Sequence, residues 1–174
     1  MQELHENEQY FFSEQTLKQF SDLLEPFQNP CILCAPTLAQ ALQSNAGSNK
    51  NIRALDIDTR FEQSLPGFRL WNLYKPTRID EQFDVIFCDP PFFNCSLSQL
   101  FSAIRLLSNF DYSQPIMICY LRRREQAVLG TFAKFHIQST GIFASYKTVQ
   151  NSGRNEIQLY SNIDFSAAPA VSFK

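Results

Sequence analysis

Short apolar runs alternate with amphipathic segments through most of this chain, and this alternation limits its fold more than any other feature. The apolar runs have the length of strands that are buried on both faces of a sheet. They predict strands over residues 31–35, 52–58, 68–74, 84–89 and 115–121, followed by two more over 136–144 and 156–163. The segments with apolar residues at helical spacing predict helices over 13–26, 37–43, 96–110 and 122–135.

Strands that alternate with helices favour a parallel α/β sheet covered by helices on both faces. The last two predicted strands are separated by a polar loop alone, so they can insert as an antiparallel pair at one edge. A length of 174 residues without an evident linker indicates one domain over residues 1–174. A loop is expected over 45–51, and a weakly ordered tail from residue 164 onward.

Composition and charge narrow the class of partner. The chain is 44% apolar and 14% aromatic, which is enough for a sizeable core. The formal net charge of −2 provides no electrostatic reason for a nucleic-acid or membrane partner. The first ten residues are polar and acidic, unlike a signal peptide, and no apolar run approaches the roughly 20 residues that span a bilayer. We therefore expect a cytoplasmic protein.

Two of the five cysteines, Cys31 and Cys34, form a CxxC pair. Such a pair is half of a zinc site or a redox pair in other contexts. Here the other half of a zinc site is missing, because the chain has only two histidines, His5 and His136. We interpret the cysteines as small apolar residues of buried strands and expect no metal.

The predicted strand over 84–89 ends in an unusual way, on the sequence Asp89-Pro90-Pro91-Phe92. Consecutive prolines fix the backbone and remove two donors, so the carbonyls of Asp89 and Pro90 have no ladder partner. A carboxylate and a nearby carbonyl offer two acceptors to one amine, and the Phe92 ring can face a base or a cation. Ligands of open α/β sheets bind at the carboxyl ends of strands, where this turn is predicted to lie. The alternative interpretation is a rigid turn that only ends the strand.

The DPPF sequence resembles the [D/N]PP[Y/F] motif of amino-methyltransferases that use S-adenosylmethionine. Five blocks together are similar in order and spacing to one family, the N6-adenine-methyltransferase-like family, which includes lysine methyltransferases of elongation factor 1-alpha. The blocks are QYFFSEQT, CAPTLAQAL, DIDTRF, FDVIFCDPPF and NEIQLYSNI, and they extend from Gln9 to about Asn162. The resemblance implies a class I Rossmann-like methyltransferase with a seven-stranded, mostly parallel sheet and an antiparallel edge.

The resemblance also implies roles for individual residues. Asp56 and Asp58 are both candidates for the acid that holds the ribose hydroxyls of the cofactor, since a carboxylate accepts two hydrogen bonds from a diol. Asp58 can instead pair with Arg60, so the choice stays open. Ala35 and Pro36 stand where the wider superfamily has a glycine-rich cofactor turn, and the smaller family shares this Ala-Pro.

The same resemblance implies a substrate pocket. Asp89, Pro90, Pro91 and Phe92 match the amine clamp and are the candidate catalytic residues. Asn155 and Glu156 match the closing block on the substrate side. Phe11 and Phe12 belong to an N-terminal aromatic block that would cover the pocket, or else pack as a hydrophobic staple on the first helix.

Three functions fit these observations. The preferred one is methylation of a lysine in a protein such as a translation elongation factor. The second is adenine-N6 methylation of RNA or DNA, with the run Arg122-Arg123-Arg124 meeting phosphates; the run is otherwise a solvated helix start. The third is a non-catalytic binding module in which side chains such as Leu38 fill the cofactor cleft.

Overall fold

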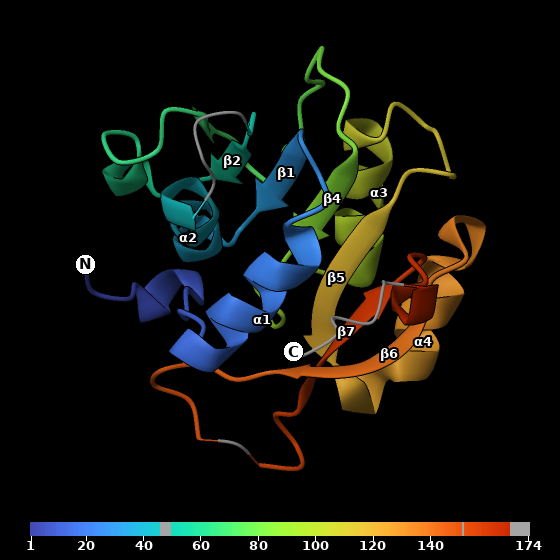
Figure 1. Cartoon of the computed structure of the whole chain (residues 1–174). Helices are drawn as coiled ribbons and strands as arrows, with labels where there is room; N and C mark the ends of the chain where they lie inside the picture. Colours follow the sequence, from blue (N-terminus) through green and yellow to red (C-terminus); the bar gives the residue numbers. More distant parts are fainter. Residues whose placement is uncertain (46–49, 151, 168–174) are drawn as a thin grey trace, which may run out of the picture.

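The computed structural model describes residues 1–45, 50–150 and 152–167 and contains one seven-stranded sheet with helices on both faces (Figure 1). Parts of the expected loop at 45–51 and of the expected tail lie outside the described residues. The strands, in chain order, are β1 (Pro30–Leu33), β2 (Arg53–Asp56), β3 (Phe68–Leu70), β4 (Val85–Cys88), β5 (Ile116–Leu121), β6 (Gln138–Ala144) and β7 (Ile157–Ser161). The helices are α1 (Glu14–Leu24), α2 (Pro36–Asn45), α3 (Leu97–Leu107) and α4 (Glu125–Thr131).

The strand order is β3-β2-β1-β4-β5-β7-β6. Strands β1 to β5 pair in parallel, whereas β7 pairs antiparallel with both β5 and β6. The mostly parallel seven-stranded sheet is thus confirmed, and the reversed strand is β7, next to the edge strand β6. The order reverses between β1 and β4, where Leu33 is in register with Cys88. This reversal point is where ligands bind in open α/β sheets.

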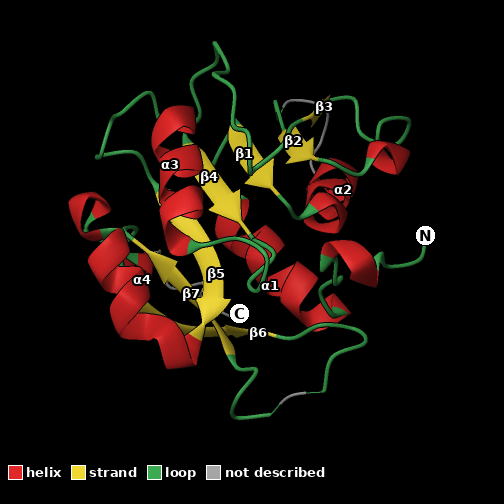
Figure 2. Cartoon of the chain, turned by 180° about the vertical axis from the view of Figure 1, so that it is seen from behind, coloured by secondary structure: helices red, strands yellow, loops and turns green. Residues whose placement is uncertain are grey.

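Helices α1 and α2 lie against each other, as do α3 and α4 on the other side of the sheet (Figures 1 and 2). The Ser13 side chain caps α1 by accepting from the Thr16 amide, and Ser96 forms a capping box with Gln99 at the start of α3. Helix α4 is shorter than predicted, because the arginine run forms a 3₁₀ turn (Arg122–Arg124) before it and Ala133–Phe135 forms another after it.

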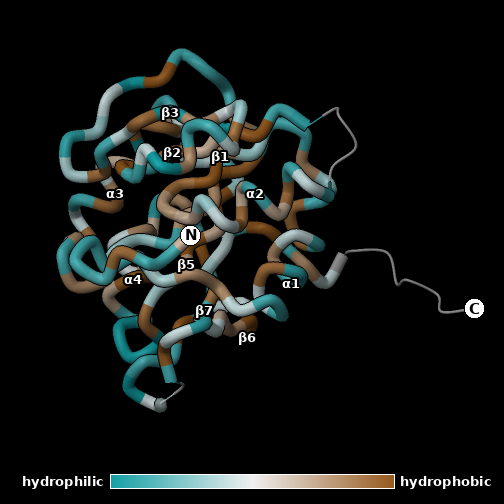
Figure 3. The backbone as a smooth tube through the Cα atoms, turned by 90° about the vertical axis from the view of Figure 1, so that its left-hand side faces the viewer, coloured by the Kyte–Doolittle hydropathy of each residue, from teal (hydrophilic) through white to brown (hydrophobic). Residues whose placement is uncertain are grey.

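The core lies on both faces of the central strands. All residues of β1, β4, β5 and β7 are buried, and Figure 3 shows the polar stretches of the chain mostly on the outer loops. Strand β3 is shorter than predicted, since Trp71 turns inward, is 3% exposed and donates its ring N–H to the Thr77 carbonyl. In the described part of the chain, no helix is long and apolar enough to cross a bilayer.

Candidate active site

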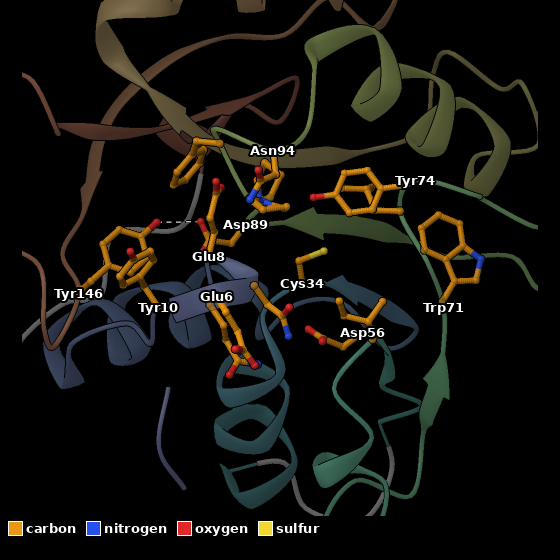
Figure 4. Close-up of a pocket in the computed structure, with 17 residues that line it drawn as sticks. Glu6, Glu8, Tyr10, Cys34, Asp56, Trp71, Tyr74, Asp89, Asn94 and Tyr146 are labelled. Atoms are coloured by element: carbon orange, nitrogen blue, oxygen red, sulfur yellow. Dashed lines mark hydrogen bonds between the residues drawn. The ribbon is translucent and has the colours of Figure 1, made fainter. Parts of the chain in front are cut away.

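A cavity of about 340 Å³ opens at the carboxyl ends of β1, β2 and β4, at the reversal point of the sheet (Figure 4). Its walls come from the N-terminal segment, the three strand ends, the segment after β3 and the segment after β6. The lining residues are Glu6, Asn7, Glu8, Gln9, Tyr10, Cys34, Asp56, Ile57, Trp71, Leu73, Tyr74, Asp89, Pro90, Pro91, Phe92, Asn94 and Tyr146. Four of these residues are acids and none is Lys, Arg or His.

The Asp89-Pro90-Pro91-Phe92 turn forms one wall of this cavity. The Asp89 amide donates to the Leu33 carbonyl at 3.1 Å, which fixes the turn against β1. Among the described residues, none donates a hydrogen bond to the Pro90 carbonyl, as expected where prolines interrupt the ladder. The Phe92 ring is half-buried and meets Tyr120 edge-on at 5.5 Å between ring centroids. One carboxylate, one backbone carbonyl and one aromatic face therefore converge on the cavity.

The carboxylate of Asp89 is held by a residue that the sequence did not single out. The Tyr146 hydroxyl donates to Asp89 Oδ1 at 2.7 Å (Figure 4). Asp89 is 9% exposed, and burial raises the pKa of its carboxyl to about 8 although the Tyr146 hydrogen bond acts in the opposite direction. Within the described residues, the second oxygen, Oδ2, accepts no hydrogen bond.

The two acids after β2 have different surroundings. The Asp58 carboxylate accepts from Arg60 Nε at 2.8 Å, from Arg60 Nη2 at 2.7 Å and from Gln9 Nε2 at 2.9 Å, and these contacts lower its pKa. It does not line the cavity. Asp56 does line it, and its Oδ1 accepts from the Asp58 amide at 2.8 Å. Burial raises the pKa of Asp56 to about 6.

The turn between β1 and α2 has no glycine and instead contains one residue with a left-handed backbone, Cys34. Cys34 has a φ of 57°, in the left-handed region that glycine favours, and it lines the cavity. Ala35 and Pro36 are buried below it and do not line the cavity; the Ala35 carbonyl accepts from the amides of Leu38 and Ala39 in α2. The backbone therefore turns sharply here without glycine.

The four residues predicted to form a substrate pocket are not brought to this cavity. Phe11 and Phe12 are 6% and 1% exposed and belong to the core, in agreement with the packing alternative. Asn155 is exposed on a loop, and Glu156 pairs with Arg122 at 2.9 Å. The resemblance places these residues by their order in the chain, but the apolar rings of Phe11 and Phe12 enter the core and Glu156 is held by Arg122.

The arginine run and the CxxC pair lie outside the candidate chemistry, except that Cys34 lines the cavity. Arg122 is bound to Glu156 and lies 5.5 Å from the centre of the Phe143 ring, while Arg123 and Arg124 are exposed.

All five cysteines are free, and the described residues contain no group of three or more His, Cys, Asp or Glu that could hold a metal ion. Leu38, proposed to fill the cleft of an inactive protein, is 0% exposed in the core, and the cavity stays open.

Comparisons with known proteins agree with this fold. Three solved methyltransferases have similar structures, each at 12% identity. N-methyltransferase NodS from Bradyrhizobium japonicum WM9 has a TM-score of 0.55 over 86% of this chain and 96% of that chain. An S-adenosylmethionine-dependent methyltransferase from Clostridium acetobutylicum ATCC 824 has a TM-score of 0.56 and covers 83% of this chain and 90% of its own chain. The third structure is the E. cuniculi Mtq2–Trm112 complex, which is described as responsible for methylation of the eRF1 translation termination factor. Its TM-score is 0.56, and the match covers 88% of this chain and 97% of that chain.

The fold is that of the class I S-adenosylmethionine-dependent methyltransferases, and the family that the sequence matches identifies an enzyme that acts on nitrogen. The chain belongs to the family described as "Probable N6-adenine methyltransferase", whose sequence model matches residues 3–165. A comparison with curated proteins finds no match.

Proposed function

We propose that this enzyme methylates the side-chain amine of a lysine in a protein such as a translation elongation factor. The observation that carries the proposal is the acidic lining of the cavity: among the described residues, its walls include the carboxyl groups of Glu6, Glu8, Asp56 and Asp89 and no Lys, Arg or His. Such a lining favours a cationic or amine-bearing guest and disfavours a polyanion. The E. cuniculi enzyme of similar fold is described as acting on a protein of translation. A substrate of this kind would place the enzyme in the cytoplasm.

The cofactor fits one side of the cavity. The Asp56 carboxylate lines the cavity and can accept from the ribose hydroxyls, and the sharp Cys34 turn lets the ligand approach the backbone. We assign the ribose contact to Asp56 rather than Asp58, because Asp58 already accepts from Arg60 and Gln9. S-adenosylmethionine supplies an electrophilic methyl group on a sulfonium centre.

The substrate amine fits the opposite side. Asp89 Oδ2 and the Pro90 carbonyl accept the two N–H groups of a neutral amine and direct its lone pair toward the methyl group. The Phe92 face packs against the aliphatic part of the lysine and favours the cation that forms on methylation. The lysine enters as a neutral amine after losing its proton to water, or to ionised Asp89, which passes the proton on to water before its Oδ2 accepts from the amine. A second proton leaves the methylated product to water.

The second candidate is methylation of adenine at N6. The exposed side chains of Arg123 and Arg124, just beyond the end of β5, favour it because they could meet phosphates. The base would have to leave its stack and lie on Phe92.

The experiment that tests both is transfer of tritiated methyl groups from S-adenosylmethionine into a cell lysate treated with nuclease or with protease. We expect label that survives nuclease and is lost with protease, with lysine as the modified residue. Asp89→Asn should abolish most of the transfer, whereas Asp22→Asn on the exposed face of α1 should leave it unchanged. Label that protease leaves intact and nuclease removes would replace the lysine proposal with the adenine one.

A further inference from the structure

The residue that holds Asp89 comes from a distant part of the chain, and its position is set by an unusual contact between the N-terminus and the segment after β6. Phe12 and Tyr146 form an isolated antiparallel bridge. The Ser13 amide donates to the Ser145 carbonyl at 2.8 Å, and the Lys147 amide donates to the Phe11 carbonyl at 2.9 Å. The N-terminal segment therefore forms a short ladder with residues 145–147.

Side chains reinforce this ladder. The Phe12 ring lies 5.1 Å from the Tyr146 ring and is 1% exposed. The hydroxyls of Ser13 and Ser145 are 2.6 Å apart, and the Ser145 amide donates to Thr16 Oγ1 at 3.0 Å. These contacts leave the Tyr146 ring little freedom to rotate, so its hydroxyl stays directed at Asp89.

We propose that Tyr146 is a positioning residue for methyl transfer: its hydroxyl fixes the Asp89 carboxylate through Oδ1, so that Oδ2 faces the substrate amine. This inference rests on the proposed function of Asp89 as the amine acceptor. It also explains the N-terminal aromatic block, since Phe12 acts on the site by holding Tyr146 and not by lining the cavity. Productive geometry depends on such support, because small misplacements of a reacting group cost much of the rate.

The hydrogen bond from Tyr146 also affects the charge of Asp89. A donor to a carboxylate stabilises its ionised form and lowers its pKa, whereas burial raises it. Within the described residues, the groups coupled to Asp89 include the thiols of Cys88 in β4 and Cys119 in β5 and the Tyr146 hydroxyl. Burial raises the pKa of each of them, so that they stay neutral. The cavity acid Glu8 accepts from the Phe93 amide at 2.9 Å. The Tyr146 hydrogen bond thus favours the ionised form of Asp89 against the effect of burial.

The test is Tyr146→Phe, which removes one oxygen and keeps the ring packed on Phe12. With S-adenosylmethionine and the protein fraction of a nuclease-treated lysate, we expect the initial rate at saturating acceptor to fall about tenfold or more. The acid limb of the pH–rate profile should move to higher pH, while the cofactor dissociation constant measured by calorimetry stays the same. The matched control is Tyr112→Phe, on a half-buried ring packed against Phe135 away from the cavity, which should change none of these.

A double-mutant cycle separates positioning from general damage to the fold. In an Asp89→Asn background, Tyr146→Phe should cause little further loss of rate, because its partner has already been altered. An equal further loss, or a wild-type rate and pH profile in Tyr146→Phe alone, would overturn the inference and leave the proposed function in place. Absence of methyl transfer by the wild-type enzyme would instead overturn the proposed function.

One measurement does not depend on the substrate. In protein with ¹³C-labelled aspartate carboxyls, NMR titration should show a higher pKa for Asp89 in Tyr146→Phe than in the wild type, and an unchanged pKa for Asp56. An unchanged or lower pKa for Asp89 would contradict the role of Tyr146 in favouring its ionised form.

Discussion

The guanidinium group of Arg60 donates to both carboxylate oxygens of Asp58, at 2.8 and 2.7 Å. The Arg60 amide and the Gln9 side chain add two further donors. Asp58 is therefore occupied by structural contacts, whereas the Asp56 carboxylate lines the cavity and accepts from the Asp58 amide through Oδ1. Two acids that are separated by one residue in the sequence have different environments because a single arginine folds back on one of them.

We predict that Asp56→Asn weakens binding of S-adenosylmethionine by about tenfold, since it weakens hydrogen bonds to a charged acceptor. Asp58→Asn should lower the temperature of unfolding but leave the affinity within about twofold, because it alters a contact outside the cavity. Calorimetric titration of both variants measures these effects. A loss of affinity in Asp58→Asn alone would reverse the assignment of the two acids.

Cofactor affinity should also depend on pH through Asp56. The pKa of Asp56 is about 6, raised by burial, so its carboxyl becomes protonated as the pH falls through that value. A protonated carboxyl accepts fewer hydrogen bonds, and the affinity for S-adenosylmethionine should decrease between pH 7 and pH 5. Asp56→Asn should remove most of this dependence. A decrease of the same size in the variant would assign it to another group.

The buried Asp89 should make stability depend on pH. Its pKa is about 8 in the folded protein against 3.8 for an ordinary aspartate, so between these values the folded state binds more protons than the unfolded state. Stability from this group is highest below pH 4 and decreases as the pH rises to 8. Asp89→Asn should therefore be more stable than the wild type at pH 9 by roughly 2–5 kcal/mol, and similar to it at pH 4. Urea unfolding at both pH values measures the difference, and equal stability at pH 9 would contradict the burial argument.

The left-handed backbone of Cys34 should make the stability of the protein depend on which side chain stands at this position. A left-handed backbone costs a residue with a Cβ atom about 1 kcal/mol and costs glycine little, and the penalty is larger for a β-branched residue. Cys34→Gly should keep the free energy of unfolding or raise it slightly, whereas Cys34→Val should lower it by about 2 kcal/mol. Thermal unfolding of the two variants gives the comparison, and equal destabilisation would show that packing dominates.

Gly67 lies in a tightly packed turn just before β3, whereas Gly130 lies in α4 with open space beside it, and alanine substitutions at the two positions should differ in sign. A Cβ atom on Gly67 would lie 1.8 Å from the Ile52 carbonyl oxygen, which belongs to the backbone and cannot move aside easily. Gly67→Ala should destabilise the protein by about 3 kcal/mol. Gly130 in α4 has open space around its Cα atom, so Gly130→Ala should stabilise the helix by about 0.5–1 kcal/mol. A neutral result for Gly67→Ala would indicate that the turn can shift.

The sequence was enough to predict the sheet, since the period and length of apolar runs such as Val85–Cys88 are local properties that set secondary structure. It also placed the Asp89-Pro90-Pro91-Phe92 turn at the end of that strand, because proline geometry acts within a few residues. The helix over 122–135 was predicted too long, since short 3₁₀ turns at both of its ends differ little from a helix in their sequence pattern.

The site depended on tertiary structure. Tyr146 is 57 residues from Asp89 in the chain, and no local pattern marks it as a partner. The choice between Asp56 and Asp58 and the packing of Phe12 beneath Tyr146 depend on contacts between distant segments. The sequence by itself determined which strands and turns form, because those depend on neighbouring residues. Only the tertiary structure decided which side chains share a cavity, because burial and hydrogen-bond partners are properties of the folded chain as a whole.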